Sequence, residues 1–213
     1  MDKKGYLKEF TFIEGMDPKN RNYLMDALII KRLPKGFVMV GDQGNCKGIP
    51  LVTKGNLRLF KISENGREMT VYRVAEGELC VLAAVCVLGG LEYQYSVEAE
   101  KDCVIADIPP EAFIYLLEKD NSFKTYVFRT LADKLISSLN TMEMITFKSI
   151  EERIIDYLDT HADNQGKIVT THEKIAIELG SSREVISRQL KKMADEGLLT
   201  QKRGSIILNK KPQ

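Results

Sequence analysis

Hydrophobic positions between residues 36 and 109 occur in short runs that are typical of β-strands. Runs rich in β-branched and aromatic residues occupy 51–53, 57–62, 69–74 and 103–108, and the middle two alternate apolar with polar positions. Glu64-Asn65-Gly66 lies between two alternating runs, as a hairpin turn does. Turn glycines recur every eleven residues, at Gly44, Gly55, Gly66 and Gly77. This spacing predicts an antiparallel sandwich or barrel.

The pattern becomes helical after Pro109-Pro110. Pro110 to Phe113 predicts a helix start, and Asn121-Ser122 predicts a break followed by a new, long helix. Along that helix a seam recurs at intervals of three and four: Phe128, Leu131, Leu135, Ser138, Met142 and Ile145. Nearly three heptads of this kind indicate a dimerisation helix, and the alternative is an amphipathic helix that packs on its own domain.

A third region follows a joint at residues 147–150. Ser149-Ile150-Glu151-Glu152 predicts a capping box for a helix that runs to His161 and stops before Gly166. The sequence therefore predicts three parts: a β-domain over 1–120, a dimerisation helix over 121–146 and a C-terminal domain over 147–213.

Two short helices in the C-terminal domain form a helix-turn-helix pattern. Residues 170–173 and 181–184 each read as a capping box, and Gly180 ends the first helix. Ile186, Leu190 and Met193 mark the inner face of the second helix, which ends at Gly197. In a helix-turn-helix the second helix enters the major groove of DNA. Two short strands around Gln201 to Gly204 then predict a basic wing.

The outer face of the second helix carries side chains suited to DNA. Arginine binds guanine in bidentate fashion, glutamate accepts from the amino group of cytosine, and lysine reaches phosphates, as Lys192 would. The alternatives are a capping role for Glu184 and a solvated surface for Arg183 and Arg188. The predicted DNA-binding residues are Ser182, Arg183, Glu184, Ser187, Arg188, Lys191, Lys202 and Arg203.

Charge distribution supports an anionic partner for this end of the chain. Lys and Arg total 31 against 30 Asp and Glu, for a net charge of +1. Residues 167–213 hold ten bases and five acids, a net of +5, so the remainder carries −4. A basic domain of this kind favours binding to nucleic acid.

Other classes of protein are disfavoured by composition and motifs. With 44% hydrophobic and 29% charged residues the chain is globular, and its longest apolar stretch, Leu79–Leu91, is too short to span a membrane. No secretory signal is recognised, so a cytoplasmic protein with reduced thiols is expected. His161 and His172 lie at helix ends without ligand spacing, and nucleotide, hydrolase and metalloprotease motifs are absent. Two alternatives remain: a thiol-based redox enzyme, and a regulatory binding module that does not bind DNA.

The chain resembles the CRP/FNR family of bacterial transcription regulators. The resemblance covers nearly the whole chain and is most specific over Gly180 to Leu190, which is similar to that family's recognition helix. It implies an α+β protein with an N-terminal β-roll (a cyclic-nucleotide-binding-like jelly roll), a long dimerisation helix and a C-terminal winged helix-turn-helix. It also implies a homodimer on double-stranded DNA that contacts RNA polymerase if it is an activator. Glu184-x-x-Ser187-Arg188 is similar to the pattern that accompanies TTGAT half-sites in the FNR branch of the family. Arg183 is similar to the arginine that reads TGTGA half-sites in the CRP branch, so both types of half-site stay open.

The candidate effector site of this chain departs from that of the family's better-known members. Cyclic-AMP binders carry Gly-Glu-Leu and Arg-Ser in their phosphate cassette, whereas this chain has Val81-Leu82 and Tyr95-Ser96 at those places. Gly77-Glu78-Leu79 imitates the triplet but lies about four residues too early. The FNR-type iron-sulfur cluster needs cysteines near the amino terminus, and residues 1–45 contain none. We therefore predict weak or no cyclic-AMP binding, and no cofactor is identified.

Two thiols in the cassette, Cys80 and Cys86, have two interpretations. Cysteine is among the most buried residue types, so inert core packing is the simpler one. The other is a sensor that acts as a disulfide switch, a thiolate ligand to haem or another metal, or a reactive thiol. The candidate effector or sensor residues are Leu79, Cys80, Val81, Leu82 and Cys86.

Overall fold

The computed structural model describes residues 3–40, 48–64, 66, 68–89 and 95–209. The chain divides into two compact units, Met1–Ile62 with Val71–Ser137 and Ser63–Thr70 with Ser138–Gln213. Among the described residues no helix is long and apolar enough to cross a membrane. The units are taken in turn below.

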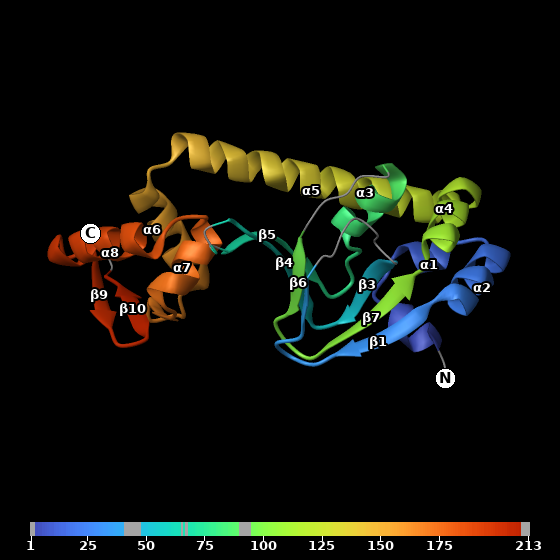
Figure 1. Cartoon of the computed structure of the whole chain (residues 1–213), viewed down its shortest axis with the longest axis horizontal. Helices are drawn as coiled ribbons and strands as arrows, with labels where there is room; N and C mark the ends of the chain where they lie inside the picture. Colours follow the sequence, from blue (N-terminus) through green and yellow to red (C-terminus); the bar gives the residue numbers. More distant parts are fainter. Residues whose placement is uncertain (1–2, 41–47, 65, 67, 90–94, 210–213) are drawn as a thin grey trace. The chain divides into compact units, whose positions relative to one another are not determined.

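Two antiparallel sheets make up the β-part of the first unit (Figure 1). The three-stranded sheet has the order β1-β7-β3, from β1 (Ile29–Leu33), β7 (Cys103–Ile108) and β3 (Ile49–Lys54). The four-stranded sheet has the order β2-β6-β4-β5, from β2 (Val38–Val40), β6 (Ser96–Ala99), β4 (Asn56–Ile62) and β5 (Glu68–Ala75). The four predicted strand runs are β3, β4, β5 and β7, so the antiparallel β-domain is confirmed.

Strand β1 lies before the block in which strands were predicted. Its five residues, Ile29 to Leu33, include no fully buried side chain, and Lys31 and Arg32 interrupt the apolar pattern. The strand exists because its backbone pairs with β7 along its whole length.

Gly55, predicted as a turn, has a φ of +86°, and a Cβ there would lie 2.7 Å from Cys103 Sγ. Gly44 lies outside the described residues.

Helices precede, interrupt and follow the strands of the first unit along the chain, and the last of them, α5 (Asn121–Phe147), continues into the second unit. The predicted helices are confirmed as α4 (Pro110–Lys119) and α5. The break between them is Asp120 rather than Asn121-Ser122, because its carboxylate accepts a hydrogen bond from Phe123 N at 3.0 Å. The sequence did not predict the others, which are a 3-10 turn (Lys3–Leu7), α1 (Phe12–Gly15), α2 (Pro18–Ala27) and α3 (Val81–Gly89).

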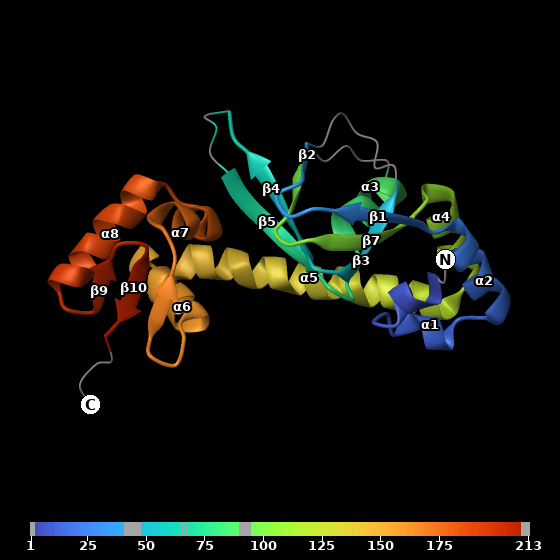
Figure 2. The same ribbon diagram turned by 90° about the horizontal axis from the view of Figure 1, so that it is seen from below.

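An aromatic cluster joins α1, α4 and the first turns of α5, which lie side by side in Figures 1 and 2. Phe12 and Phe123 have ring centroids 5.1 Å apart in an edge-on arrangement, and Phe113 lies 5.6 Å from Phe123. Phe123 and Val127 are completely buried, so the start of α5 belongs to the core of the β-domain. Edge-on aromatic pairs of this kind stabilise beyond the area they bury.

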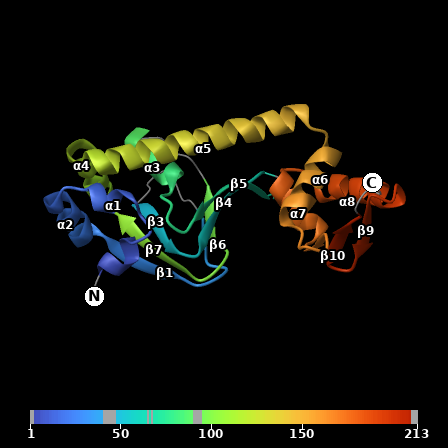
Figure 3. The same cartoon turned by 180° about the vertical axis from the view of Figure 1, so that it is seen from behind.

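The second unit contains a winged helix-turn-helix, as predicted (Figure 3). A capping box at Ser149 opens its first helix, in agreement with the sequence. Ile175, Ile186 and Leu190 are completely buried at the centre of its separate core. Its elements are α6 (Ile150–His161), β8 (Lys167–Val169), α7 (His172–Leu179), α8 (Arg183–Asp195), β9 (Leu199–Lys202) and β10 (Ser205–Leu208), with the three strands in the order β8-β10-β9.

Candidate nucleic-acid interface

The two helices of the helix-turn-helix begin one residue later than the sequence predicted. Thr171, not Thr170, caps α7, and Ser182, not Ser181, caps α8 by accepting from Val185 N at 3.3 Å. Glu184 is therefore the second residue of α8, and the capping-box role considered for it is wrong. A carboxylate in the first turn still complements the helix dipole.

The turn between the helices depends on Gly180. This residue ends α7 with a φ of +60°, a left-handed conformation that glycine adopts without steric cost. The chain then enters α8 within three residues, which fixes the second helix against the first. α8 buries Ile186, Leu190 and Met193 completely.

The opposite face of α8 is polar and accessible. Arg183, Glu184, Arg188 and Lys191 are exposed, and Ser187 is half-buried. Residues four apart lie on one row of a helix, so Arg183, Ser187 and Lys191 form one row and Glu184 with Arg188 forms the next. Glu184, Arg188 and Lys191 thus lie opposite the buried residues, while Arg183 and Ser187 lie at the border of the buried face.

Two contacts from α6 hold α8 in place. Glu151 Oε2 accepts from Gln189 Nε2 at 2.7 Å and from Lys192 Nζ at 3.1 Å. This hydrogen bond and charge raise the pKa of the exposed Lys192, and Glu196 adds a further contact at 3.6 Å. Lys192 therefore pairs with α6, and the phosphate contact expected for it from the sequence stays a prediction.

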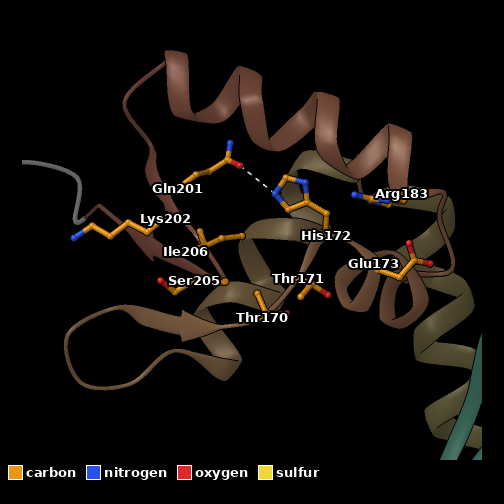
Figure 4. A pocket seen from close by; sticks show the side chains of 10 residues that line it. Thr170, Thr171, His172, Glu173, Arg183, Gln201, Lys202, Ser205 and Ile206 are labelled. Carbon is orange, nitrogen blue, oxygen red and sulfur yellow. Dashed lines mark hydrogen bonds between the residues drawn. The ribbon is translucent and has the colours of Figure 1, made fainter.

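The wing presents the predicted basic side chains. Lys202 at the end of β9 and Arg203 in the turn are both exposed, and Gly204 supplies the left-handed residue of that turn. Between the wing and the starts of α7 and α8 lies an open hollow of about 350 Å³ (Figure 4). Arg183 and Lys202 line it together with Glu173. Two cations on a concave surface favour an anionic ligand.

His172 is a residue of this site that the sequence did not identify. Its Nδ1 lies 2.8 Å from Ser187 Oγ and its Nε2 lies 3.1 Å from Gln201 Oε1. The sequence suggested only a routine polar residue at a helix start. The two partners lie 15 and 29 positions away, so no local pattern signals them.

In the β-domain, two of the candidate effector residues, Leu79 and Cys80, precede α3, and the other three lie on it. Leu79, Cys80, Val81 and Cys86 are buried, and Leu82 is half-buried. The hydroxyl of Tyr72 accepts a hydrogen bond from Leu82 N at 3.0 Å and lies 3.5 Å from Cys80 Sγ. Burial raises the pKa of the Cys80 thiol, and the contact with Tyr72 only partly opposes that rise. Cys80 is therefore a neutral thiol at neutral pH.

Side chains at the same turn contact the first half of α5. Glu78 accepts from Lys134 Nζ at 2.9 Å, and the hydroxyl of Tyr126 donates to the carbonyl of Gly77 at 3.2 Å. Burial raises the pKa of Tyr126 to about 12, so this hydroxyl keeps its proton at physiological pH. The residues before α3 are thus bonded directly to the long helix.

The seam predicted on α5 is exposed over much of its length. Phe128 is 60% exposed, Leu135 62% and Met142 66%. Leu131 differs because it packs against the core of its own domain, and Leu139, absent from the predicted seam, is 54% exposed. We call Phe128, Leu135, Leu139 and Met142 the α5 stripe. At about 100° per residue these four side chains lie within about 60° of arc.

Metal-binding chemistry has little support in the part of the chain that the structure describes. There, no three His, Cys, Asp or Glu side chains gather as a metal site. Cys80, Cys86 and Cys103 are free and buried. Cys46 lies outside the described residues.

Comparisons with known proteins agree with both units. Residues 152–213 match the Crp-like helix-turn-helix domain, and residues 30–120 match the cyclic nucleotide-binding domain. A crystal structure from Eubacterium rectale, assigned to the Crp/Fnr family of transcriptional regulators, is 31% identical, covers 95% of each chain and superposes with a TM-score of 0.82. The chain belongs to the CRP/FNR family.

More distant family members have named effectors. The cAMP-activated global transcriptional regulator Vfr of Pseudomonas aeruginosa is 24% identical over 81% of this chain and 84% of its own length. The c-di-GMP responsive global regulator CLP of Xanthomonas campestris shares the fold, with a TM-score of 0.71 at 18% identity over 90% of this chain and 99% of its own. Membership makes this chain a DNA-binding transcription regulator and agrees with the fold class inferred from the sequence.

Proposed function

We propose that this regulator binds an inverted-repeat operator as a homodimer, under the control of an effector other than cyclic AMP. The observation that carries the proposal is the polar surface of α8, where four of the five predicted residues are exposed and Ser187 is half-buried, while three apolar residues anchor the helix. Such a helix in a winged helix-turn-helix enters the major groove with its first turns at the base edges.

Within this proposal the polar residues divide by role. Arg183 and Arg188 reach guanine bases, Glu184 accepts from a cytosine amino group, and Ser187 contacts a base or a phosphate. Ser182 stands at the helix start, where amide groups meet a phosphate. Lys191 on α8 and Lys202 and Arg203 in the wing bind phosphates, which position the protein without specifying sequence.

Dimerisation is supported by the α5 stripe. Four large apolar side chains that remain more than half exposed form a contiguous strip, as a self-associating helix requires. A symmetric pair of helices would place two recognition helices in successive major grooves about 34–36 Å apart.

Cyclic AMP is disfavoured as the effector by the chemistry of the cassette. Val81 and Leu82 offer no carboxylate to a ribose hydroxyl, and the amide of Leu82 already donates to Tyr72. Tyr95 supplies no cation for the phosphate. Leaving the polar groups of the nucleotide unpaired costs a few kcal/mol. Isothermal titration with cyclic AMP is expected to give no saturable heat up to millimolar ligand, and micromolar affinity would contradict this assignment.

An effector that binds near α3 could change DNA binding through α5. The contacts of Glu78 with Lys134 and of Gly77 with Tyr126 tie that turn to α5. A ligand that favours one arrangement of the turn would shift the population between dimers competent and incompetent for DNA. An activator of this kind would also contact RNA polymerase.

Binding-site selection from genomic fragments, with and without candidate effectors, tests the proposal. The selected fragments are expected to share an inverted repeat, with a half-site of either TTGAT or TGTGA type. A protein in which Arg183→Ala and Arg188→Ala are combined should lose discrimination between the selected and scrambled duplexes while keeping its circular dichroism spectrum. Equal affinity of the unmodified protein for both duplexes would overturn the proposal.

A further inference from the structure

His172 connects the recognition helix to the wing. As the first residue of α7 it contacts Ser187 of α8 through Nδ1 at 2.8 Å and Gln201 of β9 through Nε2 at 3.1 Å. Figure 4 shows the imidazole between Gln201 and Arg183, with the hydrogen bond to Gln201 drawn as a dashed line. Its two ring nitrogens are thus bonded to two different DNA-facing elements.

The chemistry of these partners fixes the direction of each hydrogen bond. The amide oxygen of Gln201 only accepts, so Nε2 of His172 carries the hydrogen. A neutral imidazole has a single N–H, which leaves Nδ1 as an acceptor, and the hydroxyl of Ser187 must then donate to it. With its hydrogen engaged, Ser187 offers only lone pairs to a further partner.

Protonation of the imidazole reverses the contact with Ser187. Both nitrogens of a histidinium donate, so Nδ1–H donates to Ser187 Oγ and the serine hydrogen becomes free. In the major groove, adenine and cytosine present amino donors, whereas thymine and guanine present oxygen acceptors. The same serine therefore suits different bases in the two protonation states of His172.

We propose that His172 is a positioning residue that sets, by its protonation, whether Ser187 reads a base as a hydrogen-bond acceptor or as a donor. The neutral form selects a base with an amino group, and the protonated form selects one with a carbonyl oxygen. This inference rests on the proposed function, because it assumes that Ser187 meets a base in the groove.

Charged groups around the imidazole bear on the affinity as well. Those that line the hollow with His172 are Glu173 of α7, Arg183 of α8 and Lys202 of β9, while β10 contributes neutral side chains. One acid and two bases give the hollow a net positive charge. A duplex brings phosphates to this surface, so a proton on His172 adds a favourable interaction with the bound DNA. Affinity is therefore expected to rise as the pH falls.

Fluorescence anisotropy with an operator panel tests the inference. The panel varies one base pair at a time, and the position read by Ser187 is the one whose preference disappears in Ser187→Ala. At that position the unmodified protein is expected to shift its preference from the amino-bearing to the carbonyl-bearing base by about three- to tenfold between pH 8 and pH 6. A purely structural role of His172 would not change base preference with pH.

Two substitutions complete the test. His172→Asn keeps an amide near the Nδ1 position but does not titrate, so the pH-dependent shift in base preference should disappear. His161→Asn is the matched control, because the other histidine of the chain contacts Tyr157 at the end of α6 and is expected to leave the shift intact.

The outcomes separate the two proposals. A preference that is the same at pH 6 and pH 8 in the unmodified protein overturns the role of His172 while leaving the proposed function in place, and this measurement needs no variant. Persistence of the shift in His172→Asn, or its loss in His161→Asn, also overturns it. An unmodified protein that binds no duplex sequence-specifically at any pH overturns the proposed function itself.

Discussion

Replacing Leu135 by alanine is expected to weaken the dimer without unfolding the protomer. Leu135 lies at the middle of the α5 stripe and is 62% exposed in the isolated chain, so its removal leaves no cavity in the protomer. Alanine is also the best helix former, which keeps α5 intact. The change should therefore act on self-association alone.

The magnitude follows from the exposed fraction. Burying a whole leucine side chain is worth about 1.5–3 kcal/mol, so the exposed part of Leu135 has about 1–2 kcal/mol left to contribute in each chain. Two copies meet in a symmetric dimer, and the loss of about 2–4 kcal/mol raises the dissociation constant roughly 30- to 700-fold. Operator affinity should fall in parallel at protein concentrations near that constant.

Sedimentation equilibrium over a range of protein concentrations measures this effect. Met144→Ala is the control, because residue 144 lies about 180° around the helix from Leu135 and is also exposed, at 42%. The control should keep the dissociation constant of the unmodified protein. A dimer of unchanged strength in Leu135→Ala, or one weakened equally by Met144→Ala, would refute the assignment of the α5 stripe as the dimer interface.

Three further predictions concern the cassette and the DNA-binding face. Tyr72→Phe removes the acceptor for Leu82 N, and the free energy of unfolding measured by urea denaturation should fall by about 1–2 kcal/mol. An unchanged urea midpoint would show that this hydrogen bond does not contribute to stability. Because the folded-state pKa of Cys80 is raised, its contribution to stability is complete below the unfolded value of about 8.5 and is lost as the pH rises above it. Urea titrations between pH 7.5 and 10 should show that loss, and Cys80→Ala should reduce the slope. Arg183→Ala should relax the base preference and cost about 1–3 kcal/mol of binding free energy on the preferred duplex. Lys202→Ala should weaken binding to all duplexes equally and lower the slope of log affinity against log salt concentration by about one unit. The opposite result for the two variants would exchange the roles of Arg183 and Lys202.

The sequence by itself determined most of the architecture. Strands β3, β4, β5 and β7 could be predicted because alternating apolar positions and turn glycines are local signals. The inner face of α8 was equally clear, since Ile186, Leu190 and Met193 recur with the helical period. The same periodicity placed Glu184, Arg188 and Lys191 on the opposite face, so these candidate DNA-binding residues followed from the sequence.

Other features required the tertiary structure, because they depend on partners that are distant in the chain. β1 exists through its pairing with β7 rather than through its own pattern, and the caps of α7 and α8 are Thr171 and Ser182, each one residue later than predicted. The contact of Lys192 with Glu151 joins positions 41 residues apart. His172 comes to lie between the recognition helix and the wing only when the chain folds. A side-chain hydrogen bond depends on proximity in space, whereas sequence periodicity indicates only which face of a helix or strand a residue occupies.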